Sequence, residues 1–191
     1  MKKILFVCTG NTCRSPMAEA LLRTKAGDRF DVRSAGVFAP EGMPPAKPAE
    51  QVLSDKGIEL NHRTSTLNQQ WISWADLVLT MTQDHKGAVL RQFPESFGKV
   101  YTLKEYVQDD DEANVGWGRM DDLFAELETE RALANAERVK ELEEEMDELR
   151  NALPSLDISD PFGGTMVEYG DALNEIERAI ELLIRKERTE D

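Results

Sequence analysis

Residues 4–16 of the chain read Ile-Leu-Phe-Val-Cys-Thr-Gly-Asn-Thr-Cys-Arg-Ser-Pro. The run from Ile4 to Val7 is apolar and β-prone, and it lies between two lysines and a polar loop, which is typical of a short buried strand. Ser15 and Pro16 favour the start of a helix, with Ser at the N-cap and Pro at the first helical position, where its missing N–H costs nothing. The sequence therefore predicts a cysteine at the end of a strand and an arginine just before a helix N-terminus.

This arrangement suits a phosphoryl group. The backbone N–H groups from Thr9 to Arg14 can converge on one anion, and the helix dipole favours negative charge at the same place. The Arg14 guanidinium can add a two-pronged contact to phosphate oxygens. The same positive field favours a thiolate at Cys8, which is the nucleophilic form of the side chain, and the Ser15 hydroxyl can donate a hydrogen bond to it. The alternative is a buried structural cysteine beside a solvated arginine, and the strand, glycine and helix start around them disfavour it.

The stretch from Val7 to Ala20 resembles the phosphate loop of the low-molecular-weight protein tyrosine phosphatases, and it is most similar to their bacterial branch of protein-arginine phosphatases. Further similar stretches lie at 34–36, 62–63, 75–81, 102–106 and 160–164, so the resemblance leaves out only residues from about 108 to 156. It implies a flavodoxin-like phosphatase fold, with helices on both faces of a four-stranded parallel sheet. It also implies that the phosphate is bound by Thr9, Gly10, Asn11, Thr12, Cys13 and Ser15.

The pattern of elements along the chain independently favours an α/β fold. Strands are expected near 4–7, 31–36, 76–81 and 100–103, and helices near 16–26, 48–56, 66–74, 82–92 and 166–187. This alternation is typical of a parallel sheet with right-handed crossovers. Ligands of such sheets bind beyond the carboxyl ends of the strands, which is where the Cys8 loop is expected.

One segment departs from this pattern. Within a single phosphatase domain (1–191), residues 108–156 are interpreted as a long charged helical insertion. Residues 119–153 contain neither Gly nor Pro, which predicts one helix of about 35 residues. Its apolar residues form a stripe, but Leu123, Phe124 and Leu127 lie out of register, so a bend or split is expected near 128–131. Three uses of helix 119–153 stay open: packing on its own domain, self-association and partner docking.

Phosphoryl transfer to a thiolate also needs a proton donor for the leaving group. The resemblance implies that Asp160, which precedes Pro161, is this general acid and then the base for the attacking water; without it, Asp160 would be interpreted as a turn residue. Only Phe162 and two glycines follow, whereas tyrosine-specific relatives carry further aromatic residues there. The arginine phosphatases have Thr at the position of Thr12. The resemblance thus implies a phosphoarginine phosphatase acting on proteins, with specificity set by Thr12 and Phe162, and a phosphotyrosine phosphatase as the alternative.

Two other functions were weighed against these. An arsenate reductase with this loop would need further cysteines to relay electrons, and none follows Cys13. A silent phosphate-binding adaptor is disfavoured because every expected catalytic residue type is present. Cys13 itself is interpreted either as a resolving cysteine that forms a protective disulfide with Cys8 or as a buried spectator. His62 is expected to be structural and His85 to lie on a helix surface, so no metal site and no cofactor are predicted.

Charge and cysteine content limit the partners. The net charge is −14, which argues against nucleic acid and anionic membranes as partners. Most of this charge is local, since residues 109–150 contain sixteen acidic and five basic side chains. The apolar run after Lys3 is too short for a signal peptide, and no stretch is long enough for a membrane span. Two cysteines within one loop fit a reducing compartment, so a cytoplasmic enzyme with phosphorylated protein substrates is expected.

Overall fold

The computed structural model describes residues 1–108 and 111–189. Contacts divide the chain into two compact units, one made of Met1–Val107 with Leu156–Asp191 and the other of Gln108–Ser155. No helix in the described part of the chain is long and apolar enough to cross a membrane. The two units are described separately below.

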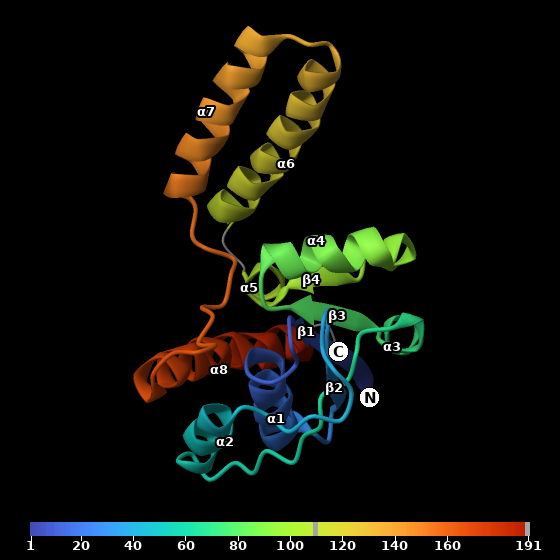
Figure 1. The fold of residues 1–191 in the computed structure, drawn as a ribbon, viewed down its shortest axis with the longest axis vertical. Coiled ribbons are helices and arrows are strands. Elements are labelled where there is room, and N and C mark those ends of the chain that lie inside the picture. Colours follow the sequence, from blue (N-terminus) through green and yellow to red (C-terminus); the bar gives the residue numbers. More distant parts are fainter. Residues whose placement is uncertain (109–110, 190–191) are drawn as a thin grey trace. The chain divides into compact units, whose positions relative to one another are not determined.

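The first unit is built on a four-stranded sheet in which every neighbouring pair of strands is parallel (Figure 1). The strand order is β2-β1-β3-β4. The predicted four-stranded parallel sheet is therefore confirmed. The first two strands of the chain pair with each other at one side of it. The strands are β1 (Lys2–Cys8), β2 (Phe30–Gly36), β3 (Leu77–Thr80) and β4 (Val100–Thr102).

Helices cover both faces of this sheet. On β1, Ile4 and Phe6 belong to one buried apolar cluster, whereas Leu5 and Val7 belong to another. A strand that is buried on both faces reads as a continuous apolar run, which is why 4–7 carries no alternation. The first cluster is completed by α1 (Arg14–Ala26), α2 (Lys47–Ser54), α5 (Leu103–Val107) and α8 (Met166–Thr189), and the second by α3 (Gln69–Trp74) and α4 (Gln83–Gln92). The short α5 and the 3₁₀ turn at Pro94–Ser96 were not predicted.

Helix α1 begins earlier than its sequence suggests. Its first residue is Arg14, its N-cap is Cys13, and no side chain caps it. The expectation that Ser15 is the N-cap is therefore wrong, because Ser15 lies inside the first turn and its hydroxyl is used by other side chains. Pro16 is still tolerated, since the N–H groups of the first turn have no partner within the helix. Starting the helix at Arg14 places its guanidinium at the carboxyl edge of the sheet.

The second unit is a hairpin of two helices, α6 (Asp111–Ala132) and α7 (Ala136–Ala152). The single helix expected over 119–153 is wrong, and the break lies at 133–135 instead of near 128–131. Ala134 has a left-handed φ of 56°, and the Asn135 Oδ1 accepts a hydrogen bond from the Arg138 N–H and so caps α7. The chain can therefore reverse there without a glycine.

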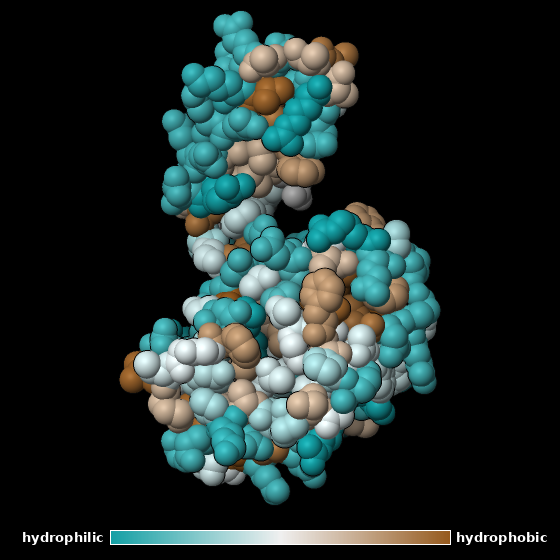
Figure 2. Space-filling model, viewed as in Figure 1, coloured by the Kyte–Doolittle hydropathy of each residue, from teal (hydrophilic) through white to brown (hydrophobic). Residues whose placement is uncertain are grey.

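Packing within the hairpin explains the change of register in its sequence. Leu123 and Leu127 of α6 form a buried cluster with Leu142 and Met146 of α7. Each apolar stripe therefore covers the other, and α7 does not present its stripe to solvent. Hydrophilic residues dominate the surface of the hairpin in Figure 2, although Val115, Phe124 and Leu133 are exposed outside this cluster. Ion pairs between the two helices join Arg119 to Glu145, Arg131 to Glu143, and Arg138 to Glu126.

In the first unit, α8 is held to the N-terminal strand by a buried carboxylate. Both oxygens of Glu187 lie 2.7 Å from the Lys2 Nζ, and the Tyr106 hydroxyl donates to the same carboxylate over 2.6 Å. Burial and the adjacent Glu187 raise the pKa of Tyr106 to about 12, so this hydroxyl stays a donor. The cluster joins β1, α5 and α8.

Candidate active site

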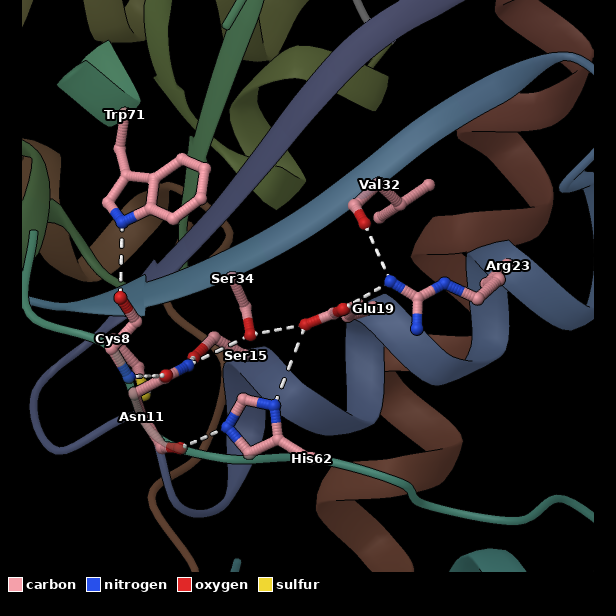
Figure 3. A network of polar contacts seen from close by, with 10 residues as sticks. Cys8, Asn11, Ser15, Glu19, Arg23, Val32, Ser34, His62 and Trp71 are labelled. Carbon is pink, nitrogen blue, oxygen red and sulfur yellow. Dashed lines mark hydrogen bonds and ion pairs between the residues drawn. The ribbon is translucent and has the colours of Figure 1, made fainter. Parts of the chain in front are cut away.

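Cys8 is the last residue of β1, so its side chain lies where ligands of parallel sheets bind. Its Sγ is 3.0 Å from the Ser15 Oγ, and only 3% of the residue is exposed. Figure 3 shows that Cys8 and Ser15 lie next to a chain of polar side chains. The geometry predicted between Cys8 and Ser15 is therefore present in the structure.

The loop after Cys8 turns its carbonyl groups outward. The Thr9 carbonyl accepts from the Phe38 N–H, the Asn11 carbonyl from the His62 Nε2, and the Thr12 carbonyl from the Ala46 N–H. By contrast, no hydrogen bond between residues of the described ranges uses the N–H of Thr9, Gly10, Asn11, Thr12 or Cys13 as its donor. Outward carbonyls leave the N–H groups free for the inner side of the loop, where an anion can accept from them.

Asn11 supports this loop from behind. It is fully buried and has a positive φ of 54°, a conformation that asparagine tolerates better than most residues. Its Oδ1 accepts from the Ser65 N–H, which fixes the orientation of the amide. The Nδ2 then donates to the Ser15 Oγ over 3.0 Å and to the Ser34 Oγ over 2.9 Å. Asn11 therefore shapes the loop, and its side chain does not line the pocket.

The directions of the hydrogen bonds between Glu19 and Cys8 follow from the Glu19 carboxylate, which lies further along this chain of side chains (Figure 3). Glu19 can only accept, so the Ser34 hydroxyl donates to its Oε2 over 2.6 Å and itself accepts from Asn11. Asn11 donates its second Nδ2 hydrogen to the Ser15 hydroxyl oxygen. The Ser15 hydroxyl thus keeps its own proton for the Cys8 Sγ, and a proton donor beside sulfur stabilises the thiolate.

His62 lies against the same network. Its Nε2 donates to the Asn11 carbonyl, and its Nδ1 is 3.8 Å from the Glu19 Oε2. Burial lowers the pKa of His62, which keeps the ring neutral at pH 7. This placement agrees with the structural role predicted for it.

Arg14 lies on the rim of the pocket although it is only 4% exposed. Its Nη1 donates to the Ile158 carbonyl over 3.2 Å, and its Nη2 is 2.8 Å from the Asp160 Oδ2. Asp160, whose side chain is 54% exposed, also accepts from the Phe162 N–H through Oδ1. The structure therefore brings Asp160 to Cys8 and Arg14, although it lies about 150 residues further along the sequence.

The three residues border one small pocket. It has a volume of about 200 Å³. Its walls are formed by Cys8, Thr9, Gly10, Thr12, Cys13, Arg14, Asp160 and Phe162. Both residues predicted to set specificity, Thr12 and Phe162, are among them, and Phe162 is 76% exposed at the mouth. Of the residues predicted to bind phosphate, Asn11 and Ser15 lie behind the loop.

Cys13 points to a different neighbour. Its Sγ lies 3.2 Å from the Tyr169 hydroxyl of α8 and 3.5 Å from the Thr12 Oγ1. Burial raises the pKa of the Cys13 thiol, and it raises the pKa of Tyr169 as well. Both cysteines are free thiols in this structure.

His85 is a site residue that the sequence interpretation missed. It was expected on a helix surface, but it is 7% exposed and joins the loop to α4. Its Nε2 is 2.8 Å from the Thr9 Oγ1, and its Nδ1 is 2.8 Å from the Thr82 Oγ1. Burial, assisted by the positive charge of Arg14, lowers the pKa of His85 to about 4, so the ring is neutral at pH 7. Thr82 as the N-cap of α4 was a usable signal, because it places residue 85 in the first turn at the sheet edge.

Within residues 1–108 and 111–189, no group of three or more His, Cys, Asp or Glu side chains is placed to hold a metal ion. The site therefore combines a buried thiol, a guanidinium, a carboxyl group and a loop of free amides around a pocket of about 200 Å³.

Comparison with known proteins identifies this arrangement. The family described as "Low molecular weight phosphotyrosine protein phosphatase" matches residues 3–117. The chain belongs to this family. A protein-arginine-phosphatase of Geobacillus stearothermophilus is 39% identical over 188 residues, which cover 98% of this chain and 97% of that protein. The match therefore spans the hairpin segment as well.

Two further similarities bear on the site. A protein-arginine-phosphatase of Bacillus subtilis (strain 168) is 51% identical over 107 residues, or 54% of this chain and 71% of that protein. A solved structure titled as the YwlE arginine phosphatase, a cysteine-to-serine mutant with a phosphorylated active site serine, has a TM-score of 0.71 and 34% identity. It covers 96% of this chain and 94% of that one. Members of this phosphatase family thus share the fold of this chain.

Proposed function

We propose that the protein is a cysteine-dependent protein phosphatase that hydrolyses phosphoarginine on proteins through a cysteinyl-phosphate intermediate. The observation on which this rests most is the Cys8 sulfur beside the Ser15 hydroxyl, in a pocket rimmed by Arg14 and Asp160. Two relatives named protein-arginine-phosphatase support the choice of substrate.

In the first step, the Cys8 thiolate attacks phosphorus and the bond from phosphorus to the leaving nitrogen breaks. The free loop amides from Thr9 to Cys13 and the Arg14 guanidinium hold the equatorial oxygens, where charge develops. Arg14 can do so while it keeps its present partners, because its contacts within the described ranges leave Nε and one hydrogen on each terminal nitrogen available. Asp160, in the protonated form that the second step regenerates, gives its proton to the departing nitrogen.

In the second step, water attacks the phosphorus of the cysteinyl-phosphate. Asp160, now ionised, accepts a proton from this water, the bond from sulfur to phosphorus breaks, and inorganic phosphate leaves. The Cys8 thiolate is regenerated and again accepts the Ser15 hydroxyl proton. The residues proposed to act directly on the reacting atoms are therefore Cys8, Arg14 and Asp160, with Thr9, Gly10, Asn11, Thr12, Cys13 and Ser15 forming or supporting the phosphate loop.

The substrate preference is proposed from the mouth of the pocket. After Phe162 the chain continues as Gly163 and Gly164, so one side of the mouth carries no aromatic wall for a tyrosine ring. Asp160 is suited to pair with the cationic guanidinium that leaves from phosphoarginine. The exposed Phe162 ring is the observation that favours phosphotyrosine, which is the second candidate substrate.

The free thiols of Cys8 and Cys13 fit a reducing compartment, and we place the enzyme in the cytoplasm on that basis. Phosphorylated proteins are its proposed partners. Self-association or partner docking through 119–153 would have to use side chains other than the apolar stripe, which the hairpin buries within itself.

The deciding experiment compares kcat/KM on two peptides of the same sequence, one with phosphoarginine and one with phosphotyrosine. We expect the phosphoarginine peptide to be the better substrate by at least tenfold. A preference for phosphotyrosine would overturn the proposed specificity and leave the second candidate. Cys8→Ser is the control variant: it should lose turnover on both peptides while it still binds inorganic phosphate, and an active Cys8→Ser enzyme would remove Cys8 from the nucleophile role.

A further inference from the structure

A second hollow adjoins the small pocket, and the mechanism does not use it. It has a volume of about 580 Å³, and it shares Thr9, Arg14 and Asp160 with the pocket that contains Cys8. The phosphoryl group and the atoms next to it are accommodated by the smaller pocket of about 200 Å³. The larger hollow, which we call the flanking groove, is therefore available to a different part of a ligand.

One wall of the flanking groove is a single face of α4. Asp84, Ala88 and Arg91 line it, and their spacing of four and then three residues places them on the same side of the helix. Asp84 and Arg91 are exposed, and neither forms an ion pair or a side-chain hydrogen bond with any residue in the part of the chain that the structure describes. The groove thus offers a free carboxylate and a free guanidinium on one wall.

Another part of the lining is apolar. Val37 and Phe38 follow β2 and line the groove, and Phe38 is 79% exposed. The carbonyls of Cys8 and Thr9 hold this segment in place, because they accept from the Val37 and Phe38 N–H groups. A large exposed ring on a fixed backbone, in the same lining as two unpartnered charges, is typical of a surface that binds polypeptide.

We propose that the flanking groove binds the stretch of substrate polypeptide next to the phosphorylated residue, with Asp84 facing a cationic side chain and Arg91 an anionic one. This inference rests on the proposed function. The occupant follows from the way in which the two hollows adjoin. When a protein places its phosphorylated side chain at Cys8, the rest of that protein runs out of the small pocket past Thr9, Arg14 and Asp160. These three residues also line the flanking groove. The enzyme would then select among phosphorylated sites by the charge of the substrate residues next to them.

The test uses the full chain and three substrates: free phosphoarginine, a phosphoarginine peptide with lysines beside the target, and the same peptide with glutamates instead. Each kcat/KM on a peptide is divided by that of the same enzyme on free phosphoarginine. For Asp84→Lys we expect this ratio to fall about two- to fivefold for the lysine peptide and to rise for the glutamate peptide, the range expected of exposed ion pairs. For Arg91→Glu we expect the reverse, and both effects should shrink at high salt.

Two further variants serve as controls for this comparison. Asp84→Asn removes the charge without placing a cation in the first turn of α4, and it should change the ratio in the same direction by a smaller factor. Asp28→Lys changes the net charge by the same amount as Asp84→Lys. Asp28, however, lies just before the amino end of β2, whereas the groove lies at the carboxyl ends of the strands. The peptide-to-phosphoarginine ratio of Asp28→Lys should therefore match that of the wild type.

Ratios that do not depend on the sign of the flanking charges, or that shift equally in Asp28→Lys, would overturn the flanking groove and leave the proposed function standing. A wild-type enzyme that hydrolyses neither free phosphoarginine nor the peptides would instead overturn the proposed function, and the groove with it.

Discussion

Thr12 is where the specificity proposal can be tested at the scale of one side chain. Its hydroxyl lies in the wall of the small pocket, 3.5 Å from the Cys13 Sγ. We expect Thr12→Ile to lower kcat/KM for a phosphoarginine peptide by roughly three- to tenfold, the value of one lost hydrogen bond, and to raise it for phosphotyrosine. Steady-state kinetics on both peptides measure this.

Two matched variants separate the hydroxyl from the shape of the Thr12 side chain. Thr12→Ser keeps the hydroxyl and should retain the wild-type preference, whereas Thr12→Val keeps the shape and should behave like Thr12→Ile toward phosphoarginine. An unchanged ratio of the two substrates in Thr12→Ile would remove Thr12 from the specificity argument.

His85 gives a prediction on pH and stability. Its pKa of about 4 in the folded protein lies below the usual value near 6.5, so the unfolded chain binds the extra proton more readily. The stability that this group contributes is present above pH 6.5 and is lost as the pH falls toward 4. Because His85→Gln cannot titrate, its unfolding free energy should fall less than that of the wild type between pH 7 and 5, by about 2 kcal/mol.

Urea denaturation at the two pH values measures this difference, and other titrating groups contribute equally to both proteins. Gln can also keep a contact with the Thr9 hydroxyl, whereas His85→Ala cannot, so the alanine variant should lose more turnover. Parallel stability curves for wild type and His85→Gln would show that His85 is not the buried neutral group inferred here.

The residue scale also shows what sequence can and cannot predict. Cys8, Ser15 and Arg14 lie within eight consecutive residues, so the strand-loop-helix pattern alone was enough to place them close together. Asp160 needed the resemblance to a family, since nothing local relates it to Arg14. His85 was missed because its burial depends on Thr9 and Thr82, and such tertiary contacts leave no periodicity in the sequence.

At the scale of elements, the longer helices that pack on the sheet were predicted, whereas the short α5 and the hairpin, where two helices meet each other, were not. Residues 119–153 have high helix propensity throughout, so propensity favoured one long helix. The reversal at 133–135 depends on Ala134 and on the cap by Asn135, and no glycine or proline marks it. The out-of-register Leu123 and Leu127 were the remaining signal, because two stripes that face each other need not share one register.

The hairpin core gives a prediction at the same scale. Leu142 is fully buried between α6 and α7, so Leu142→Ala should destabilise the hairpin by about 2–5 kcal/mol. Hydrogen exchange and limited proteolysis over residues 111–152 should become faster. Leu133→Ala is the control, since Leu133 is 68% exposed and its truncation should leave both rates nearly unchanged. Equal protection in the two variants would contradict the packing described for the hairpin.

For the whole molecule, the parallel sheet was predictable because alternating strands and helices allow few topologies. The division into two compact units was harder to foresee, because a helical hairpin and a single inserted helix have similar compositions. Every residue that lines the small pocket and the flanking groove belongs to the unit of Met1–Val107 and Leu156–Asp191.

This placement predicts the effect of removing the hairpin. A variant in which a short Gly-Ser linker replaces residues 110–155 should fold and keep kcat/KM on free phosphoarginine within about threefold of the wild type, because loops of this kind add little closure cost. Circular dichroism checks the fold and steady-state kinetics the activity. A folded but inactive deletion variant would mean that the hairpin contributes to the site.

The contacts of α8 set an order of events during synthesis. Helix α8 follows the other elements of the described chain in sequence, yet its Tyr169 contacts Cys13 and its Glu187 holds Lys2 of β1. A nascent chain that has already translated Cys8 therefore still lacks one wall of the core beneath the phosphate loop. Cys8 is translated well before α8, and its surroundings are assembled only when α8 packs against them, so we expect no turnover by a nascent chain that lacks α8.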